Sequence, residues 1–332
     1  MNNKVQFPGI TIQHLDLADE LASTAIHDLG LVEKSVEEID TTREDYLVSV
    51  TDLETLETLE EVTATIESLP DGTTLTTDTE RVMLNHVLES IERRLYVPVD
   101  TLAPALESVD KKDNLLKRMY EAIKKALIKF YNSVKDFFKR IGSGIASLLG
   151  MNKKNKESIE TLKKAGITEV ETTKEEQAIM DETTHMGKVA MEMLADSDNK
   201  TEEQLDAIKQ GFDKKAADIK RKLDKLDEDI KKGDKQLAKV ADYIDRVKEV
   251  DAIFDALLDL QKKHDADEAK AKRDLEASKE DEASLKKADK KHRKQTRNKA
   301  AAAAALADSA KRITKQTNKS LAKAIAQAND DK

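Results

Sequence analysis

The chain has 332 residues and a net charge of −9, and 37% of its residues are Asp, Glu, Lys or Arg. Only 3% are aromatic and none is Trp or Cys, which argues against a large globular core and excludes disulfides and cysteine-based metal sites. With 10 Gly and 4 Pro among many helix-forming residues, the composition predicts an elongated all-α protein.

The N-terminal sequence contains no recognisable export signal. MNNKVQFPGI has one Lys and leads into no apolar run of signal-peptide length. No stretch of the chain reaches the run of about 18 apolar residues that a bilayer-spanning helix needs. We therefore expect a protein that is made in the cytoplasm without a signal peptide or a transmembrane helix.

Charge is unevenly distributed along the sequence. Residues 1–110 hold 24 acidic and 6 basic side chains, whereas residues 111–156 hold 13 basic and 3 acidic ones. A second basic cluster, at 286–299, has 8 basic side chains and one acidic one. An acidic segment can pair with a basic one, and basic stretches attract phosphate or anionic lipid. The simpler alternative is that these charges are only the solvated faces of helices.

The acidic N-terminal region, residues 1–107, is predicted to form several short helices. Thr51 and Glu54 form a capping box, in which the Thr hydroxyl and the Glu carboxylate satisfy free backbone amides, so one helix is predicted to begin there and to end at Pro70. Another is predicted at about 80–96. The first helix of the region is marked by an apolar stripe of Leu15, Ala18, Leu21, Ala22, Ala25, Ile26 and Leu29.

Residues 108–150 are predicted to form a cationic amphipathic helix. Apolar residues recur three and four positions apart, which places them on one face. Aromatic groups opposite lysines are typical of a helix in a bilayer interface, although a helix packed inside a bundle shows the same stripe. The face predicted to contact a membrane or a partner consists of Leu116, Tyr120, Ile123, Leu127, Phe130, Val134, Phe137, Phe138 and Ile141.

Basic side chains of this helix and of the second basic cluster are candidate contacts to DNA or another anionic surface. Each would neutralise phosphate charge without reading base sequence, because neither segment contains a recognition motif. The candidates are Lys117, Arg118, Lys124, Lys125, Lys129, Lys135, Lys139, Arg140, Lys290, Lys291, Arg293, Lys294 and Arg297.

Residues 151–200 are predicted to hold a linker followed by one short helix. The stretch MNKKNKES, at 151–158, is polar and is interpreted as the linker. Thr173 and Glu176 form a second capping box, so a helix is predicted to begin after Thr173.

Residues 201–262 are predicted to form one coiled-coil helix. A third capping box at Thr201 opens it, and the apolar residues that follow alternate three and four apart with charged residues between them. The alternation continues across Gly233, so we favour a continuous helix. An antiparallel hairpin that turns at Gly233-Asp234 would use the same residues as cap and turn.

Residues 263–332 are predicted to form charged, Ala-rich helices. They include six consecutive alanines at 300–305 and few large apolar groups, so helix propensity alone is expected to hold much of this region. A thin apolar stripe from Leu306 to Ala328 is expected to seal against the coiled coil.

No arrangement of residues predicts catalysis, a cofactor or a metal site. The six His are scattered, and none has the spacing that puts two imidazoles on one metal. The sequence has no phosphate-binding glycine loop and no nucleophile motif. Asp227 and Asp229 suggest a calcium loop, but the apolar stripe through Ile230 favours a plain helix. We therefore expect a non-enzymatic protein.

The order of features around Glu107 resembles the internal head proteins of large tailed bacteriophages. An acidic region is followed by LAPALES, at 102–108, and then by a Lys- and Phe-rich helix. The resemblance implies an N-terminal propeptide that directs the protein into the assembling head, and a prohead protease that cuts after the Glu of a small-x-Glu motif. On this sequence the motif is Ala105, Leu106 and Glu107, so the mature chain would begin at Ser108.

The resemblance also implies a location inside the virion. The partners would be other head proteins or a second copy through the coiled coil, packaged DNA, an anionic membrane and the prohead protease. The acidic region would mask the cationic helix until cleavage. An acidic scaffold or core protein of the same particles fits nearly as well. The alternative from another class is a cellular membrane-associated coiled-coil protein or a pore-forming helical toxin, with residues 205–328 as its stalk.

Overall fold

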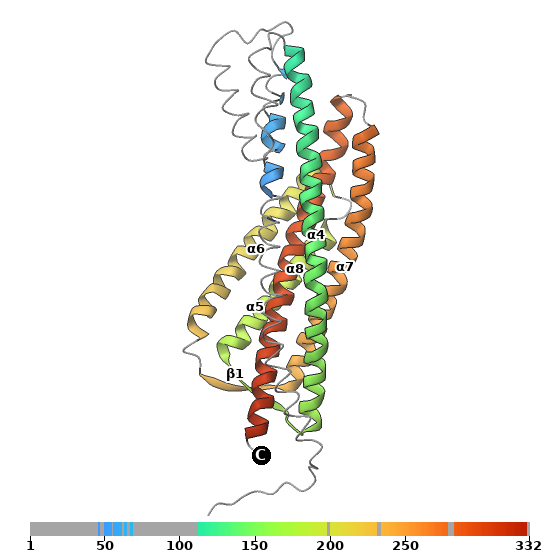
Figure 1. Cartoon of the computed structure of the whole chain (residues 1–332). Coiled ribbons are helices and arrows are strands. Elements are labelled where there is room, and N and C mark those ends of the chain that lie inside the picture. The colour runs from blue at the N-terminus through green and yellow to red at the C-terminus, as the bar shows by residue number, and fades with distance from the viewer. Residues whose placement is uncertain are drawn as a thin grey trace, which may run out of the picture.

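The computed structural model describes two parts of the chain, and both are mainly helical. The first part consists of positions 46, 50–54, 56–61, 63–64 and 67–68, which we call the N-terminal segment. The second part comprises residues 112–197, 200–230, 234–277 and 282–330. Long helices run side by side through the second part and form an elongated bundle (Figure 1), so the predicted elongated all-α class is confirmed.

The second part consists of long helices and one short pair of strands. In chain order these are α4 (Lys112–Lys164), β1 (Glu169–Thr173), α5 (Lys174–Asp196), α6 (Glu202–Asp229), β2 (Lys235–Lys239), α7 (Val240–Ala277) and α8 (Glu282–Asp330). β1 and β2 pair antiparallel, with Glu169 opposite Lys239 and Thr173 opposite Lys235. This small sheet lies at the lower end of the bundle in Figure 1.

α4 is the predicted amphipathic helix, but it is longer than predicted. It continues to Lys164, so the stretch at 151–158 is helical and the predicted linker is wrong. Two inward positions in this stretch carry Asn, and polar residues there gave the stretch the composition of a linker. The three-four alternation of inward positions runs on without a break through Ile141, Ile145, Leu148, Asn152, Asn155, Ile159 and Leu162.

A layer of buried polar side chains crosses the bundle at these two asparagines. Asn152 Nδ2 donates to Asp251 Oδ1 of α7 at 2.8 Å. Asn155 Nδ2 donates to the backbone oxygen of Thr314 at 3.3 Å, and Asn318 Nδ2 donates to Asn155 Oδ1 at 3.2 Å. Apolar clusters lie on both sides of the layer. Because buried amides need specific partners, the layer fixes the register of α4, α7 and α8.

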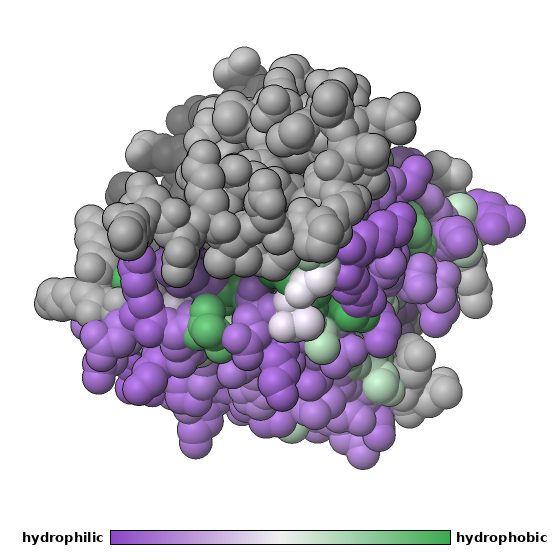
Figure 2. Space-filling view, turned by 90° about the horizontal axis from the view of Figure 1, so that it is seen from below, coloured by the Kyte–Doolittle hydropathy of each residue, from purple (hydrophilic) through white to green (hydrophobic). Residues whose placement is uncertain are grey.

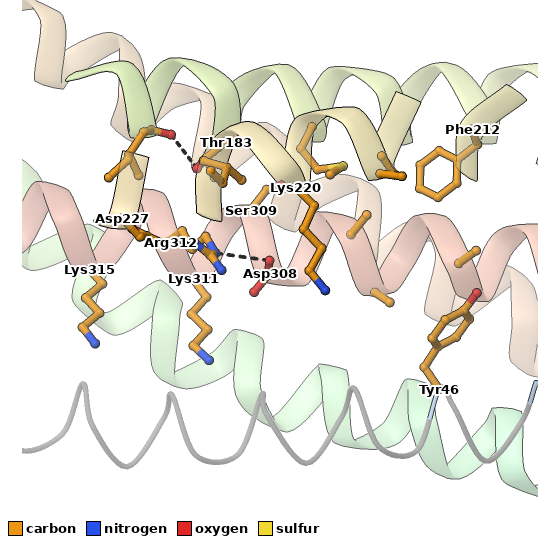
Figure 3. Close-up of a pocket in the computed structure, with 18 of the residues that line it drawn as sticks. Tyr46, Thr183, Phe212, Lys220, Asp227, Asp308, Ser309, Lys311, Arg312 and Lys315 are labelled. Atoms are coloured by element: carbon orange, nitrogen blue, oxygen red, sulfur yellow. Dashed lines mark hydrogen bonds and ion pairs between the residues drawn. The ribbon is translucent and has the colours of Figure 1, made fainter. Parts of the chain in front are cut away.

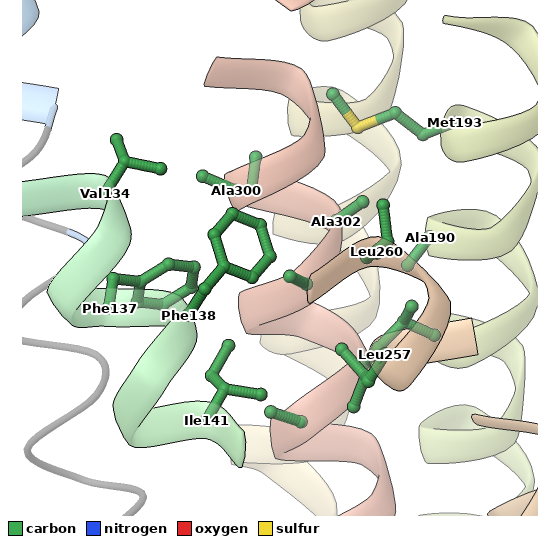
Figure 4. Close-up of a cluster of buried hydrophobic side chains, with 14 of the residues drawn as sticks. Val134, Phe137, Phe138, Ile141, Ala190, Met193, Leu257, Leu260, Ala300 and Ala302 are labelled. Atoms are coloured by element: carbon green, nitrogen blue, oxygen red, sulfur yellow. The ribbon is translucent and has the colours of Figure 1, made fainter. Parts of the chain in front are cut away.

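α8 lies at the centre of the bundle and contacts α4, α5, α6 and α7. Residues 300–303 of the alanine run are buried, and Figure 4 shows Ala300 and Ala302 in one cluster with Phe138, Leu260 and Ala190 of the neighbouring helices. Small side chains let helices approach closely. The prediction that propensity alone holds this region is therefore wrong, because the alanines are core residues. The predicted stripe is buried at Leu306, Ala310, Ile313, Thr317, Leu321 and Ala324.

The predicted continuous coiled coil over 201–262 is also wrong. α6 ends at Asp229, and β2 separates it from α7. The strand β2 is held by β1, and the backbone amide of Val240 donates to the carbonyl of Thr168 at 2.9 Å. The chain reverses here, and apolar residues of both helices enter the main core, among them Phe212 and Leu223 of α6 and Phe254 of α7. A three-four alternation is the same for one long helix and for two shorter helices that face a common core, so it could not distinguish them.

Two predicted helix starts are confirmed by their capping boxes. The amide of Glu176 donates to Thr173 Oγ1 at 3.1 Å, and the amide of Thr173 donates to the Glu176 carboxylate at 3.1 Å. The same pair of bonds forms at the predicted box of Thr201. The predicted start at Thr51 is wrong, because Tyr46 and Val50 are already helical.

Candidate functional site

The apolar face of α4, predicted to contact a membrane or a partner, lies inside the folded bundle. Leu116 and Tyr120 are half-buried against the core, and Ile123, Leu127, Phe130, Val134, Phe137, Phe138 and Ile141 are buried. This corrects the prediction of an exposed apolar strip, because other helices of the chain occupy the face. On the side shown in Figure 2, the described surface is mostly hydrophilic with small apolar patches. Among the described helices, none combines the length and the apolar character that crossing a bilayer requires.

The N-terminal segment covers part of α4 and α8. Its Leu53, Leu56 and Leu59 are buried in the main core. Asp52 is only 2% exposed, and its carboxylate lies 3.2 Å from Lys129 Nζ while it accepts a hydrogen bond from Ser133 at 2.7 Å. These contacts confirm the expected pairing of the acidic region with the cationic helix at Lys129.

A second ion pair joins the N-terminal segment to α8. Arg293 is 2% exposed, and its guanidinium donates to Glu60 Oε1 at 2.6 Å. Next to it, the His292 ring lies against Tyr131 of α4, with 5.7 Å between ring centroids. Arg293 is therefore part of an intramolecular contact and not an open site for DNA.

Two more cations of the second basic cluster are paired within the bundle. Lys294 Nζ and the Arg297 guanidinium donate to the two carboxylate oxygens of Asp206 at 2.7 and 2.8 Å. Burial alone would raise the pKa of Asp206, but these hydrogen bonds outweigh it and lower the pKa. Asn298 Nδ2 adds a bond to the carbonyl of Leu205 at 3.0 Å. The prediction that Lys294 and Arg297 contact DNA is corrected, because they fasten α6 to α8.

The remaining candidate cations differ in their positions. The side chains of Lys117 and Arg118 lie outside the described residues, and Lys124 is half-buried. Two positions of the second basic cluster, Lys290 and Lys291, are exposed. An exposed face of α4 with a net positive charge is formed by Lys125, Lys135, Lys139 and Arg140 together with Asp136.

The predicted processing site, Ala105, Leu106, Glu107 and Ser108, lies outside the described residues, as do the helices predicted near 15–29 and 80–96. The described chain resumes at Lys112, the first residue of α4. A cut after Glu107 would therefore fall between the N-terminal segment and the bundle to which that segment is paired.

Two side chains with strongly shifted pKa values, Glu171 and Tyr46, owe the shifts to contacts within the fold. Hydrogen bonds from Lys323 and Lys235 lower the pKa of Glu171 to about 2 and tie β1 to α8 and β2. Burial, and then the nearby Asp213 carboxylate, raise the pKa of Tyr46 to about 12. Within the part of the chain that the structure describes, no three His, Asp or Glu side chains gather in a way that could hold a metal ion.

The structure contains a groove that the sequence did not predict. It has a volume of about 700 Å³ and lies along α6 and α8, with α5 contributing to its lining. α6 leans away from the bundle toward its C-terminal end (Figure 1). Tyr46 and Phe212 lie at one end of the groove, and Asp227 and Lys315 lie at the other (Figure 3). A groove of this kind depends on the angle between two helices, which the sequence pattern does not encode.

Comparison of the chain with protein-family models, curated proteins and solved structures gave no match. The class is therefore defined by the structure itself. The protein is an elongated bundle of charged helices with a polar layer in its core and an acidic segment paired to its basic helices.

Proposed function

We propose that the protein is a non-enzymatic structural protein of a tailed-bacteriophage head, in which an acidic N-terminal region covers a basic helical bundle until proteolysis separates them. The observation that carries the proposal is the pairing of the N-terminal segment with both basic regions of the sequence. Asp52 is held by Lys129 of α4, and Glu60 by Arg293 of α8. The setting comes from the resemblance around Glu107.

The geometry gives a cut after Glu107 a specific consequence. Before the cut, the covalent link keeps the N-terminal segment at high effective concentration beside α4 and α8. After the cut, the same contacts must hold two separate molecules together, so the segment can leave. Its departure would remove the carboxylates of Asp52 and Glu60 from Lys129, which shares α4 with the exposed Lys125 and Lys139, and from Arg293 of α8.

DNA is the anionic partner that this surface fits best. Lysines on one helix face neutralise phosphates without base contacts, so binding would be independent of sequence and would weaken steeply with salt. A membrane fits the folded bundle less well, because the aromatic groups of α4 are buried. The alternative of a membrane-associated coiled-coil protein or a pore-forming toxin would require α4 to leave the bundle.

Mass spectrometry of the protein from its native particles tests the setting. We expect a mature N-terminus at Ser108 in purified heads and the full chain in unassembled material. An intact chain in mature heads, or absence of the protein from heads, would overturn the proposal of a processed head protein.

The unmasking step can be tested with purified protein. A recognition sequence for a site-specific protease is inserted after Glu107, and binding to labelled duplex DNA is measured by fluorescence anisotropy before and after cutting. We expect cutting and gel filtration to remove the N-terminal fragment and to raise the affinity, with log K falling linearly as log salt rises. A fragment that stays bound, or an unchanged affinity, contradicts unmasking.

Charge variants show which surface binds. The double variant Lys125→Glu/Lys139→Glu changes the exposed face of α4, and Lys214→Glu/Lys225→Glu makes the same change on exposed positions of α6. We expect the first pair to weaken DNA binding by the cut chain and to reduce its salt dependence, and the second to have a much smaller effect. Equal effects would show that net charge alone drives binding. Binding of the cut chain to anionic liposomes in preference to DNA would favour the membrane alternative.

A further inference from the structure

We propose that the groove between α6 and α8 binds residues 15–29 of the same chain as an acidic amphipathic helix. These residues lie outside the described part of the structure, and their sequence is LDLADELASTAIHDL. The inference does not depend on DNA binding or on cleavage, because it concerns a contact within the intact chain.

The groove has the size and lining that suit one apolar helix face. On α8 its lining runs from Ala301 to Gln316, a length of about 22 Å at about 1.5 Å per residue. The 15 residues of the segment would span about 21 Å as a helix. Apolar groups of three helices line the groove, including Ile179, Met186, Phe212, Leu223, Ala304 and Ala305.

The charge of the groove favours an acidic occupant. Arg312 pairs with both Asp227 and Asp308, which are the acids near it. Lys209 likewise pairs with Asp213. The lining acids are therefore already paired with cations of the bundle. The lining holds four cations, Lys220, Lys311, Arg312 and Lys315, against the three acids Asp213, Asp227 and Asp308, so it carries one positive charge in excess.

The segment has the complementary pattern. Its apolar residues are Leu15, Ala18, Leu21, Ala22, Ala25, Ile26 and Leu29, which share one side of a helix. Asp16, Asp19, Glu20 and Asp28 provide its charge, and no Lys or Arg occurs anywhere from residue 5 to residue 33. A cationic groove with an apolar floor is the surface that such a helix fits.

The path of the chain brings the segment to the groove. Tyr46 lines the groove at one end and lies against Phe137, with 6.0 Å between ring centroids. Only 16 residues separate Leu29 from Tyr46, and at about 3.3 Å per residue they can reach any point along the groove. The tether gives the segment an effective concentration in the millimolar range, which favours this occupant over a separate molecule.

Thiol protection tests whether the groove is covered. The chain has no Cys, so Ala304→Cys places a single thiol in the groove lining of the full-length protein. The rate at which this thiol reacts with a maleimide is measured in the Ala304→Cys variant and in a second variant that also carries Leu21→Glu/Ile26→Glu. Loss of two buried apolar side chains is expected to speed the reaction about tenfold or more. The matched control Thr24→Glu, off the apolar side, is expected to leave the rate within about twofold.

Crosslinking identifies the occupant. A carbodiimide joins carboxylates to lysines in direct contact, and we expect peptides that link 15–29 to Lys220, Lys311 or Lys315. The crosslinking is repeated on a mixture of unlabelled and ¹⁵N-labelled protein. We expect each crosslinked pair of peptides to be either wholly unlabelled or wholly labelled, because both peptides come from one chain. Mixed pairs would show that a second copy fills the groove and would overturn the proposal. A freely reactive thiol without crosslinks would overturn it as well. Both outcomes are independent of DNA affinity, so failure here leaves the proposed function standing.

Discussion

Truncation of Phe138 tests the finding that the apolar face of α4 is a core face. The side chain is 1% exposed, and its ring lies 4.6 Å from that of His264 and 5.3 Å from that of Phe137 between centroids. An aromatic side chain buries at least about 150 Å², which corresponds to about 4 kcal/mol at about 25 cal/mol per Å². Measured core replacements of Phe by Ala cost about 3–5 kcal/mol, so we expect Phe138→Ala to lose about 4 kcal/mol.

The matched control lies on the same helix. Ile128 is 38% exposed, so Ile128→Ala is expected to cost about 1 kcal/mol or less. The free energy of unfolding is measured by urea titration, with circular dichroism at 222 nm and tyrosine fluorescence as two probes whose transitions should coincide. If the free energies of unfolding of the two variants fall by the same amount within about 1 kcal/mol, Phe138 is not buried in the core. The apolar face of α4 would then have to be interpreted as an exposed surface.

Two further changes test the polar contacts. Asn155→Leu removes the acceptor of Asn318 Nδ2 and is expected to lower the free energy of unfolding by about 1–3 kcal/mol in the same urea titration. The double variant Asn155→Leu/Asn318→Leu should recover part of that loss, because no unpaired amide is left. A single variant as stable as the parent would contradict the role of this hydrogen bond. Asp206→Asn removes a carboxylate whose pKa is lowered in the folded protein. The stability that this carboxylate contributes is fully present above about pH 4, the ordinary carboxyl pKa, and is lost as the pH falls through the lowered pKa. The gap in Tm between parent and variant should therefore be widest near neutral pH and close in acid, and a gap that stays constant into strong acid would refute the assignment.

Much of the fold follows from local signals in the sequence. The capping boxes at Thr173 and Thr201 predicted the starts of α5 and α6 because their hydrogen bonds form between residues three positions apart. The apolar stripe of α4 likewise predicted which of its residues point inward. The expected pairing of acidic and basic regions is present at Asp52 and Glu60.

The failed predictions concern relations between helices. An apolar stripe shows that a helix face is buried but not what covers it. The sequence pattern around Phe137 and Phe138 is therefore the same whether lipid or α8 covers them. The asparagines of 151–158 have partners on α7 and α8, which are distant in sequence, and without those partners the stretch has a linker's composition. For the same reason Arg293 and Arg297 were assigned to DNA, whereas their carboxylate partners come from far earlier in the chain. The groove depends on a splay angle that no local pattern encodes.

The central position of α8 has a consequence for how the protein is made. α4, α5, α6 and α7 all pack on a helix that the ribosome synthesises after them. Until α8 emerges, the phenylalanines of α4 have no alanine surface to close against, and folding must wait for contacts between residues far apart in sequence. A nascent chain that lacks this helix would expose the apolar face of α4 to chaperones and proteases. Translational arrest before residue 300 should therefore yield degraded protein instead of a shorter folded product.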